Sequence, residues 1–352
     1  MAAPAVDTRP GAAAVPLWRT GLSDHVAALA IAPGRGMVAA GSLGGDAVVL
    51  DAADGTPVAR LAEHPLGVLS LAWSPGGRRL ATGGQDGRVS LWDRIDGAFG
   101  SIDLPGWVVA LAWSPDGALL AAAGGRDVAV VRSDGTIVAR YGGHPSTVSS
   151  LDWEPGGGRL AVAAYGGVRW YDPRRDLAAP VQEYAWKGSI LTVAVSPDGR
   201  WLASGNQDST SKVWAIPTGE DLEMTGYPAK VERLAWDDRG DNLAVASSEI
   251  VMVWRCGGPG PEGTRPHLLE AHTDRITDLR FQQSGSLLAT VGRDGLLAVW
   301  NLAKRRRPHR ALAVGEPLSS AGWVAGDSLV VGTAAGEVLR LGIGGGGPAP
   351  RR

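Results

Sequence analysis

The chain has 352 residues, of which 44% are hydrophobic and 20% charged, a composition typical of a folded protein with a sizeable core. Its formal net charge of −2 provides no overall attraction to nucleic acid or to an anionic membrane. A single cysteine, Cys256, excludes an internal disulfide and a cysteine-cluster metal site, and it suits the cytoplasm, where we place the protein. No apolar stretch approaches the roughly 20 residues that a bilayer-spanning helix needs, and the N-terminal sequence does not have the pattern of a signal peptide.

Eight short apolar runs recur along the chain at a nearly constant spacing. Their last residues are separated by 42, 40, 40, 42, 41, 45 and 42 positions, and they are Ile31, Trp73, Trp113, Trp153, Val195, Trp236, Phe281 and Trp323. Most runs are followed by a tight turn, a second strand pattern such as LATGG, another turn, and a third strand pattern such as VSLWD. A more polar fourth strand completes each unit. The sequence therefore predicts an all-β fold built from four-stranded repeats.

The period of about 40 to 45 residues and the terminal Trp-Asp pairs, such as Trp92-Asp93, resemble the WD40 repeat. The resemblance covers residues 15–343 and implies one closed β-propeller in which each unit is a four-stranded blade with its first run innermost. Eight runs predict eight blades, and seven, the commoner number in the family, is the alternative. We expect disordered tails at residues 1–14 and 344–352.

The two ends of the repeat region predict how the ring closes. The last unit ends after Glu337–Ile343 in a Gly- and Pro-rich tail, so it lacks an outer strand. The segment VPLWRT, residues 15–20, is an outer strand without a unit of its own. We therefore expect the N-terminal strand to complete the last blade, which removes two exposed sheet edges.

WD40 blades are often linked internally by hydrogen bonds among a His, a Ser or Thr, an Asp and a Trp. The resemblance assigns such structural hydrogen-bond networks to the second unit (His64, Thr82, Asp86, Trp92) and to the seventh (His272, Thr290, Asp294, Trp300). The fifth unit has Trp186 in place of the histidine, and the fourth retains only His144. The alternative is a catalytic Ser/Thr–His–Asp set. However, these residue types recur at the same positions of the repeat together with the Trp, so we expect no enzyme activity. No phosphate-binding loop or metal-binding motif is present, so we expect no cofactor and no metal.

In the WD40 family, partners commonly dock on the face formed by the loops that lead into the innermost strands and by the turns between second and third strands. Aromatic and Arg side chains there anchor interfaces well because they bury a large area at a small entropic cost. We predict a partner-binding set of Trp107, Trp186, Lys187, Tyr227, Lys230 and Arg275 from the loops, with Gln85, Arg126, Gln207 and Arg293 from the turns. The alternative for Trp186 and Tyr227 is that each replaces a missing histidine and packs inside its blade.

The sequence thus predicts a non-enzymatic scaffold, monomeric in isolation, that binds a protein or peptide. The segments EYAWKGSI, GYPAKV and GPEGTRP are similar to those of stand-alone bacterial WD40 proteins, and this similarity implies a metal-chaperone GTPase of CobW type as the partner. The alternatives are a propeller enzyme or small-molecule binder that uses the central channel, and a nucleic-acid-associated WD40 protein. The basic run Lys304–Arg310 is interpreted as a solvated loop, with a contact to nucleic acid or to an acidic partner as the alternative.

Overall fold

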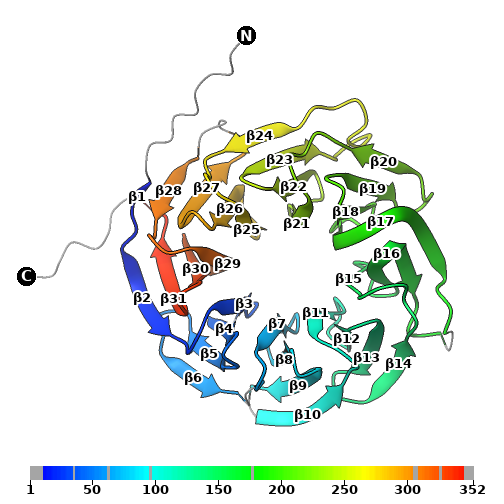
Figure 1. The fold of residues 1–352 in the computed structure, drawn as a ribbon, viewed down its shortest axis with the longest axis horizontal. Coiled ribbons are helices and arrows are strands. Elements are labelled where there is room, and N and C mark those ends of the chain that lie inside the picture. Colours follow the sequence, from blue (N-terminus) through cyan, green and yellow to red (C-terminus); the bar gives the residue numbers. More distant parts are fainter. Residues whose placement is uncertain are drawn as a thin grey trace, which may run out of the picture.

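The computed structural model describes residues 11–34, 36–61, 64–94, 97–175, 178–303, 308–324 and 327–344. All regular elements in these ranges are β-strands, and they form a ring around an open centre (Figure 1). Hydrogen bonding joins the strands into seven sheets, in which the first strand of a repeat lies at the centre and the last lies at the rim. Among the described residues, no helix is long and apolar enough to span a bilayer.

Three antiparallel sheets hold the first three repeats. From the centre outwards, the first contains β3 (Val26–Ile31), β4 (Met37–Ser42), β5 (Ala47–Asp51) and β6 (Pro57–Arg60). The second contains β7 (Val68–Trp73), β8 (Arg79–Gly84), β9 (Arg88–Asp93) and β10 (Gly97–Asp103). The third contains β11 (Val108–Trp113), β12 (Leu119–Gly124), β13 (Asp127–Arg132) and β14 (Ile137–Tyr141).

The sixth, seventh and eighth repeats also form one sheet each. The sixth contains β21 (Val231–Trp236), β22 (Asn242–Ser247), β23 (Ile250–Arg255) and β24 (His267–Glu270). The seventh contains β25 (Ile276–Phe281), β26 (Leu287–Gly292), β27 (Leu296–Asn301) and β28 (Arg310–Ala313). The eighth contains β29 (Leu318–Val324), β30 (Ser328–Thr333) and β31 (Glu337–Gly342), with β2 (Pro16–Gly21) as its outer strand.

The fourth and fifth repeats share one six-stranded sheet. Its strands are β15 (Ser150–Trp153), β16 (Leu160–Tyr171), β17 (Gln182–Val195), β18 (Trp201–Asn206), β19 (Ser211–Ala215) and β20 (Asp221–Met224). The first part of β17 pairs with β16, and its last part, Ile190–Val195, pairs with β18, so one strand is the outer strand of one repeat and the inner strand of the next. Hydrogen bonding continues because the connecting segment stays extended and Ser189 pairs with Tyr165. All eight predicted inner runs form strands, but the prediction of eight separate blades is not matched, since the ring has seven sheets, as in the seven-blade alternative.

The N-terminal strand β2 joins the two ends of the repeat region. It pairs antiparallel with β31, and the buried Trp18 donates from Nε1 to the carbonyl of Ala52 in the first repeat at 3.0 Å. At the centre of the ring, Ser319 Oγ of the eighth repeat donates to the carbonyl of Val26 at 2.6 Å. A short strand β1 (Ala12–Ala13) pairs in parallel with β28, so strand pairing begins before the predicted boundary at residue 15.

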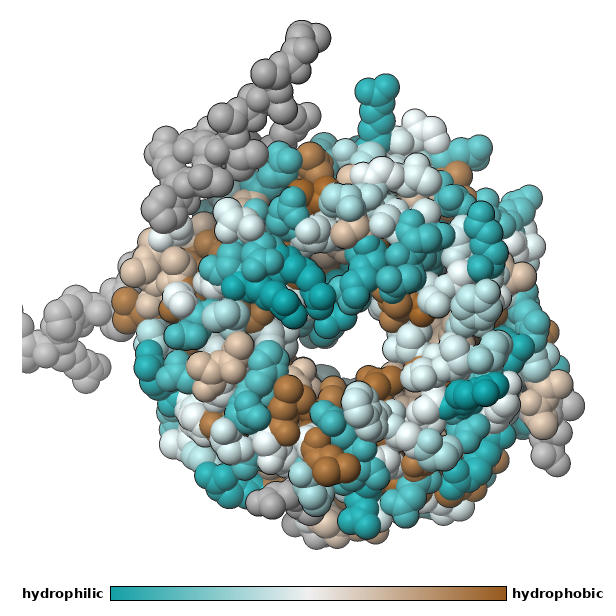
Figure 2. All heavy atoms as spheres, viewed as in Figure 1, coloured by the Kyte–Doolittle hydropathy of each residue, from teal (hydrophilic) through white to brown (hydrophobic). Residues whose placement is uncertain are grey.

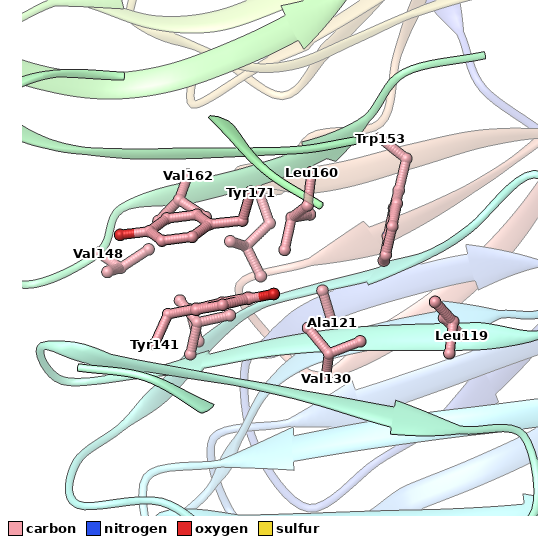
Figure 3. Packing of buried hydrophobic residues seen from close by; sticks show 12 residues of the cluster. Leu119, Ala121, Val130, Tyr141, Val148, Trp153, Leu160, Val162 and Tyr171 are labelled. Carbon is pink, nitrogen blue, oxygen red and sulfur yellow. The ribbon is translucent and has the colours of Figure 1, made fainter. Parts of the chain in front are cut away.

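The hydrophobic core lies between the faces of neighbouring sheets. The middle strands are the most buried, and every residue of β4 and β12 is buried. Between the third and fourth repeats, Tyr141 and Tyr171 stack with ring centroids 4.0 Å apart, beside Trp153 and Val162 (Figure 3). A sheet of alternating side chains has two apolar faces to cover, and each repeat covers them only by packing on both neighbours.

Tryptophans at the ends of inner strands link consecutive repeats. Each of these tryptophans donates from its indole Nε1 to a backbone carbonyl of the preceding repeat. The accepting residue lies one position before the last residue of the apolar run in that repeat. The pairs are Trp73 to Ala30 (3.1 Å), Trp113 to Ala72 (3.0 Å), Trp153 to Ala112 (2.9 Å), Trp236 to Ala194 (3.0 Å) and Trp323 to Arg280 (2.9 Å). The recurrent final Trp of the apolar run therefore holds adjacent inner strands in register, a role that the sequence patterns alone did not predict.

Candidate partner-binding face

We define the upper face as the face of the ring at which the inner strands begin. Backbone hydrogen bonds join the loop that leads into an inner strand to the turn between the second and third strands of the same repeat. They include Gln85 N to Gly67 O (2.9 Å), Gln207 N to Ser189 O (3.0 Å) and Arg293 N to Arg275 O (2.9 Å). The two kinds of loop in which the sequence placed its partner-binding residues therefore form one surface.

The seventh repeat contains a complete hydrogen-bond network beneath this face. His272 Nδ1 lies 3.1 Å from Asp294, His272 Nε2 lies 2.8 Å from Thr290 Oγ1, and Trp300 Nε1 donates to the same hydroxyl at 3.0 Å. With a neutral imidazole, the Trp donates to the hydroxyl, the hydroxyl to Nε2, and Nδ1 to the carboxylate, so every group has a partner. Burial raises the pKa of Asp294, but hydrogen bonds from His272 and from the backbone outweigh it, so the pKa is lowered overall.

The second repeat contains a shorter network than the sequence predicted. His64 Nε2 lies 2.7 Å from Thr82 Oγ1, and His64 Nδ1 lies 3.0 Å from Asp86. The indole nitrogen of Trp92 is buried and has no hydrogen-bond partner. The prediction that Trp92 belongs to this network is therefore corrected, although its sequence motif matches that of the seventh repeat.

The structure also corrects the prediction for two aromatic residues of the partner-binding set. Trp186 and Tyr227 are only 8% and 6% exposed, so they pack inside their repeats at the position of the missing histidine. The Tyr227 hydroxyl accepts a hydrogen bond from Trp254 Nε1 at 2.8 Å, and burial raises the pKa of this hydroxyl. The ring of Trp186 lies 4.5 Å from the ammonium of Lys212, which pairs with Asp221 at 2.6 Å.

Trp107 remains exposed, at 59%, and three residues that the sequence analysis did not select accompany it on the upper face. Leu66, like Trp107, lies in a loop that leads into an inner strand, Leu43 lies in a turn between a second and a third strand, and Tyr165 lies within β16, next to the positive-φ Gly166. Their exposed fractions are 61%, 39% and 51% for Leu66, Leu43 and Tyr165. We call these four residues the apolar arc. A sequence signal was present for Leu43, which occupies a turn position at which polar residues are usual.

The apolar arc belongs to the first four repeats, whereas most of the charged candidates belong to the fifth to seventh. Glu232 lies between two predicted cations, 3.0 Å from Lys230 Nζ and 3.3 Å from Arg275 Nη1. Lys187, Gln207 and Arg293 are exposed, as is Arg126 in the third repeat, and Gln85 is half-buried. In the view of Figure 2, hydrophilic side chains gather over β21 and β25, and hydrophobic ones lie near β3 and β7.

The opposite face, at which the inner strands end, carries a pocket. This pocket has a volume of about 780 Å³ and lies among the first, seventh and eighth repeats, lined by Ile31, Phe281 and Trp323 with Arg280 and Asp327. No three His, Cys, Asp or Glu side chains of the described chain are close enough together to hold a metal ion. In the basic run, residues 304–307 lie outside the described residues, and Arg310 belongs to β28.

The sequence matches the family described as "WD domain, G-beta repeat" (WD40) over residues 55–93, 101–138, 135–172, 179–215 and 263–301, just over half of the chain. The chain belongs to the WD40 family.

Among curated relatives, "Cell division cycle 20.1, cofactor of APC complex" of Arabidopsis thaliana is 24% identical over 72% of this chain and 58% of its own length. The human F-box-like/WD repeat-containing protein TBL1X is 26% identical over 64% of this chain and 34% of its own length. The chain thus spans less than two thirds of these WD40 relatives.

Two solved structures share the fold. One is Sqt1 of Chaetomium thermophilum, bound to the N-terminus of ribosomal protein L10, with a TM-score of 0.80, 20% identity, and coverage of 94% of this chain and 100% of that one. The other is the computationally designed Ika8 protein, with a TM-score of 0.79, 22% identity, and coverage of 93% and 99%. At these identities the likeness concerns the fold alone.

Proposed function

We propose that this WD40 protein is a non-enzymatic scaffold that binds a protein or peptide on its upper face, with the apolar arc as the anchor. The observation that carries the proposal is the placement of exposed apolar side chains. Apart from the arc, the large apolar residues exposed in the described chain lie in or beside the outer strands, namely Val15, Leu17, Val58, Ile137 and Val181. Several exposed large apolar side chains on one face are typical of an interaction site.

The chemistry of the arc suits a protein partner better than a small molecule. Trp107 and Tyr165 present broad rings with few rotatable bonds, so their ordering on binding costs little entropy. The neighbouring charged half adds a rim that steers and orients a partner. Two proteins similar to this chain support this, since one is a cofactor of the APC complex and the other, Sqt1, was solved bound to the N-terminus of ribosomal protein L10.

Affinity capture from the source cell tests the proposal with three forms of the protein. We expect the wild type and the control variant Val58→Ala/Ile137→Ala, which alters exposed apolar residues of outer strands, to capture the same protein. The variant Trp107→Ala/Tyr165→Ala should lose that protein while retaining the melting temperature of the wild type. Equal capture by all three forms would remove the apolar arc from consideration.

A metal-chaperone GTPase of CobW type is the partner that we propose on the sequence similarity of three segments. Purified GTPase, with and without bound nucleotide, would be titrated against the wild type and the same two variants. We expect binding by the wild type and by the outer-strand variant only. Absence of binding by the wild type would reject this partner and leave the upper face open to another protein.

The pocket on the face opposite to the upper face supports a second candidate function, the binding of a small molecule. Its volume of about 780 Å³ lies within the range usual for ligand sites, and its wall combines Phe281 and Trp323 with Arg280, which pairs with Asp278 at 3.2 Å. A screen of aromatic compounds by thermal shift, with Arg280→Ala as the variant of the pocket wall, would detect such binding. A compound that stabilises the wild type and the variant equally would argue against the pocket.

A further inference from the structure

The fourth repeat retains the network histidine but has lost both of its partners. His144 occupies the place of His64 and His272 in the loop that leads into the inner strand, and it is 1% exposed. Val162 stands at the position of the threonine, and the segment of β16 that follows, Tyr165–Gly167, contains no acidic residue. In the second and seventh repeats, Thr82 and Thr290 with Asp86 and Asp294 fill these two places.

The loss leaves a polar ring without partners inside the protein. His144 Nε2 is buried and has no hydrogen-bond partner, and the hydroxyl of the neighbouring Tyr141 is in the same situation. Burial, with a smaller contribution from Arg169, lowers the pKa of His144 to about 4, so the ring is neutral at pH 7. A neutral imidazole has one N–H to donate and one nitrogen that accepts, and leaving such groups unpaired in a protein interior is unfavourable.

A notch opens from His144 to the upper face. It has a volume of about 70 Å³, and its walls include Pro145, Tyr165, Gly166, Arg169 and Glu183. Since a water molecule takes up about 30 Å³ of liquid, the notch has room for roughly two waters or one carboxylate group. Tyr165, a member of the apolar arc, forms part of its rim.

The charges at the notch cancel, so they do not repel a single incoming negative group. Arg169 Nε pairs with Glu183 at 3.2 Å, which neutralises that acid and leaves other guanidinium donors. Arg126 lies beside the notch, and its Nε donates to the His144 carbonyl at 2.5 Å. Asp127 is the remaining acid that acts on His144, so the two arginines balance the two acids before any ligand arrives.

We propose that the notch receives the carboxylate of an Asp or Glu side chain of the protein partner, which takes the place that Asp86 and Asp294 occupy in the second and seventh repeats. The incoming carboxylate accepts a hydrogen bond from the imidazole of His144 and lies within reach of Arg169. The proposal rests on the proposed function, since it assigns one acidic residue to a partner that lies across the apolar arc. It requires no covalent change.

Formate, the smallest carboxylate, is the probe for the notch itself. The protein, labelled with ¹⁵N at its six histidines, is titrated with sodium formate and, as a control, with sodium chloride at equal ionic strength. We expect formate to shift the ring signals of His144 saturably and to leave those of His64 and His272 unchanged, with no effect of chloride. No saturable shift would overturn the proposal, and an equal response to chloride would show an adventitious ion only.

The variant Gly166→Asp supplies the missing acid from the chain itself. Gly166 has a φ of 91°, which Asp adopts more readily than most residues, and no atom lies within 4 Å of an added Cβ. In this variant the ring signals of His144 should move toward those of His64, and formate should no longer shift them. A folded variant whose His144 still responds to formate as the wild type does would contradict the assignment.

Random peptides displayed on phage identify the source of the carboxylate. Peptides that lose binding to the variant Trp107→Ala should contain Asp or Glu, and replacement of that acid by Asn or Gln should weaken binding about tenfold or more. Gly166→Asp should weaken the same peptides. Peptides that depend on Trp107 but not on an acid would overturn the notch proposal and leave the proposed function intact. If no peptide depends on Trp107, the proposed function fails, and a formate response would then indicate a free carboxylate rather than a partner's side chain.

Discussion

The two histidine networks predict different losses of stability for the same substitution at equivalent sites. Thr290→Val keeps the shape of a fully buried side chain but leaves both His272 Nε2 and Trp300 Nε1 without a partner. Each buried group left unsatisfied costs about 1–3 kcal/mol, so we expect a loss of roughly 2–6 kcal/mol. Thr82→Val affects only His64 Nε2, because Trp92 Nε1 has no partner to lose, and we expect about 1–3 kcal/mol.

Urea denaturation followed by tryptophan fluorescence measures both losses, since the chain contains 14 Trp residues spread over the ring. The midpoints should fall in the order wild type, Thr82→Val, Thr290→Val, with similar slopes. The double variants Thr290→Val/Trp300→Phe and Thr82→Val/Trp92→Phe are the controls. Removal of the indole should recover part of the loss in the seventh repeat and none of it in the second. Equal losses for the two threonine variants would refute the reasoning that a shared hydroxyl satisfies Trp300.

Three further predictions concern the ring. Burial raises the pKa of Asp152 to about 6. The carboxylate of Asp152 accepts hydrogen bonds from the backbone N–H groups of Val195 and Trp153. Because this pKa is raised on folding, its contribution to stability is present below the unfolded value near 4 and is lost as the pH rises through about 6. The free energy of unfolding of the wild type, relative to Asp152→Asn, should therefore fall between about pH 4 and 6 and level off above, and a constant difference would contradict the assignment. Deletion of residues 1–21 removes β2 and the buried Trp18, so the melting temperature should fall by several degrees, whereas deletion of residues 1–10 should change it little; equal values for both would argue against closure by β2. Trp236→Phe removes the hydrogen bond to the Ala194 carbonyl and should lower the free energy of unfolding by about 1 kcal/mol, while the same change at exposed Trp107 should have no effect.

The repeat pattern predicted the strands well because each inner run is defined by its own residues. Alternating apolar residues, turn glycines and the spacing of the runs placed all eight inner strands, including the one that ends at Val195 without a Trp. The number of separate sheets was not predictable in this way. It depends on whether the chain between the fourth and fifth repeats breaks its hydrogen bonding, and the pairing of Ser189 with Tyr165 keeps it continuous.

The candidate site was predicted less completely, since residue type does not determine exposure. Trp186 and Tyr227 have the chemistry of interface anchors, but the vacancy left by a missing histidine is an apolar space that an aromatic ring fills. Trp92 and Trp300 end motifs with the same His, Thr and Asp, yet only the indole of Trp300 reaches its threonine, a difference of side-chain orientation that no sequence pattern contains. Leu43 and Leu66 were missed because single apolar residues in loops are common and become informative only when their positions show that they share a face.

Site-specific photocrosslinking tests most directly whether the partner contacts the apolar arc. A photoreactive phenylalanine derivative would replace Trp107 on the upper face in one form of the protein and Val58 on the outer rim in another, and each would be irradiated in the source cell. We predict a discrete crosslinked product from position 107 that is absent from position 58 and is reduced when Tyr165→Ala is added. The same product from both positions, or a product from position 58 alone, would contradict the account.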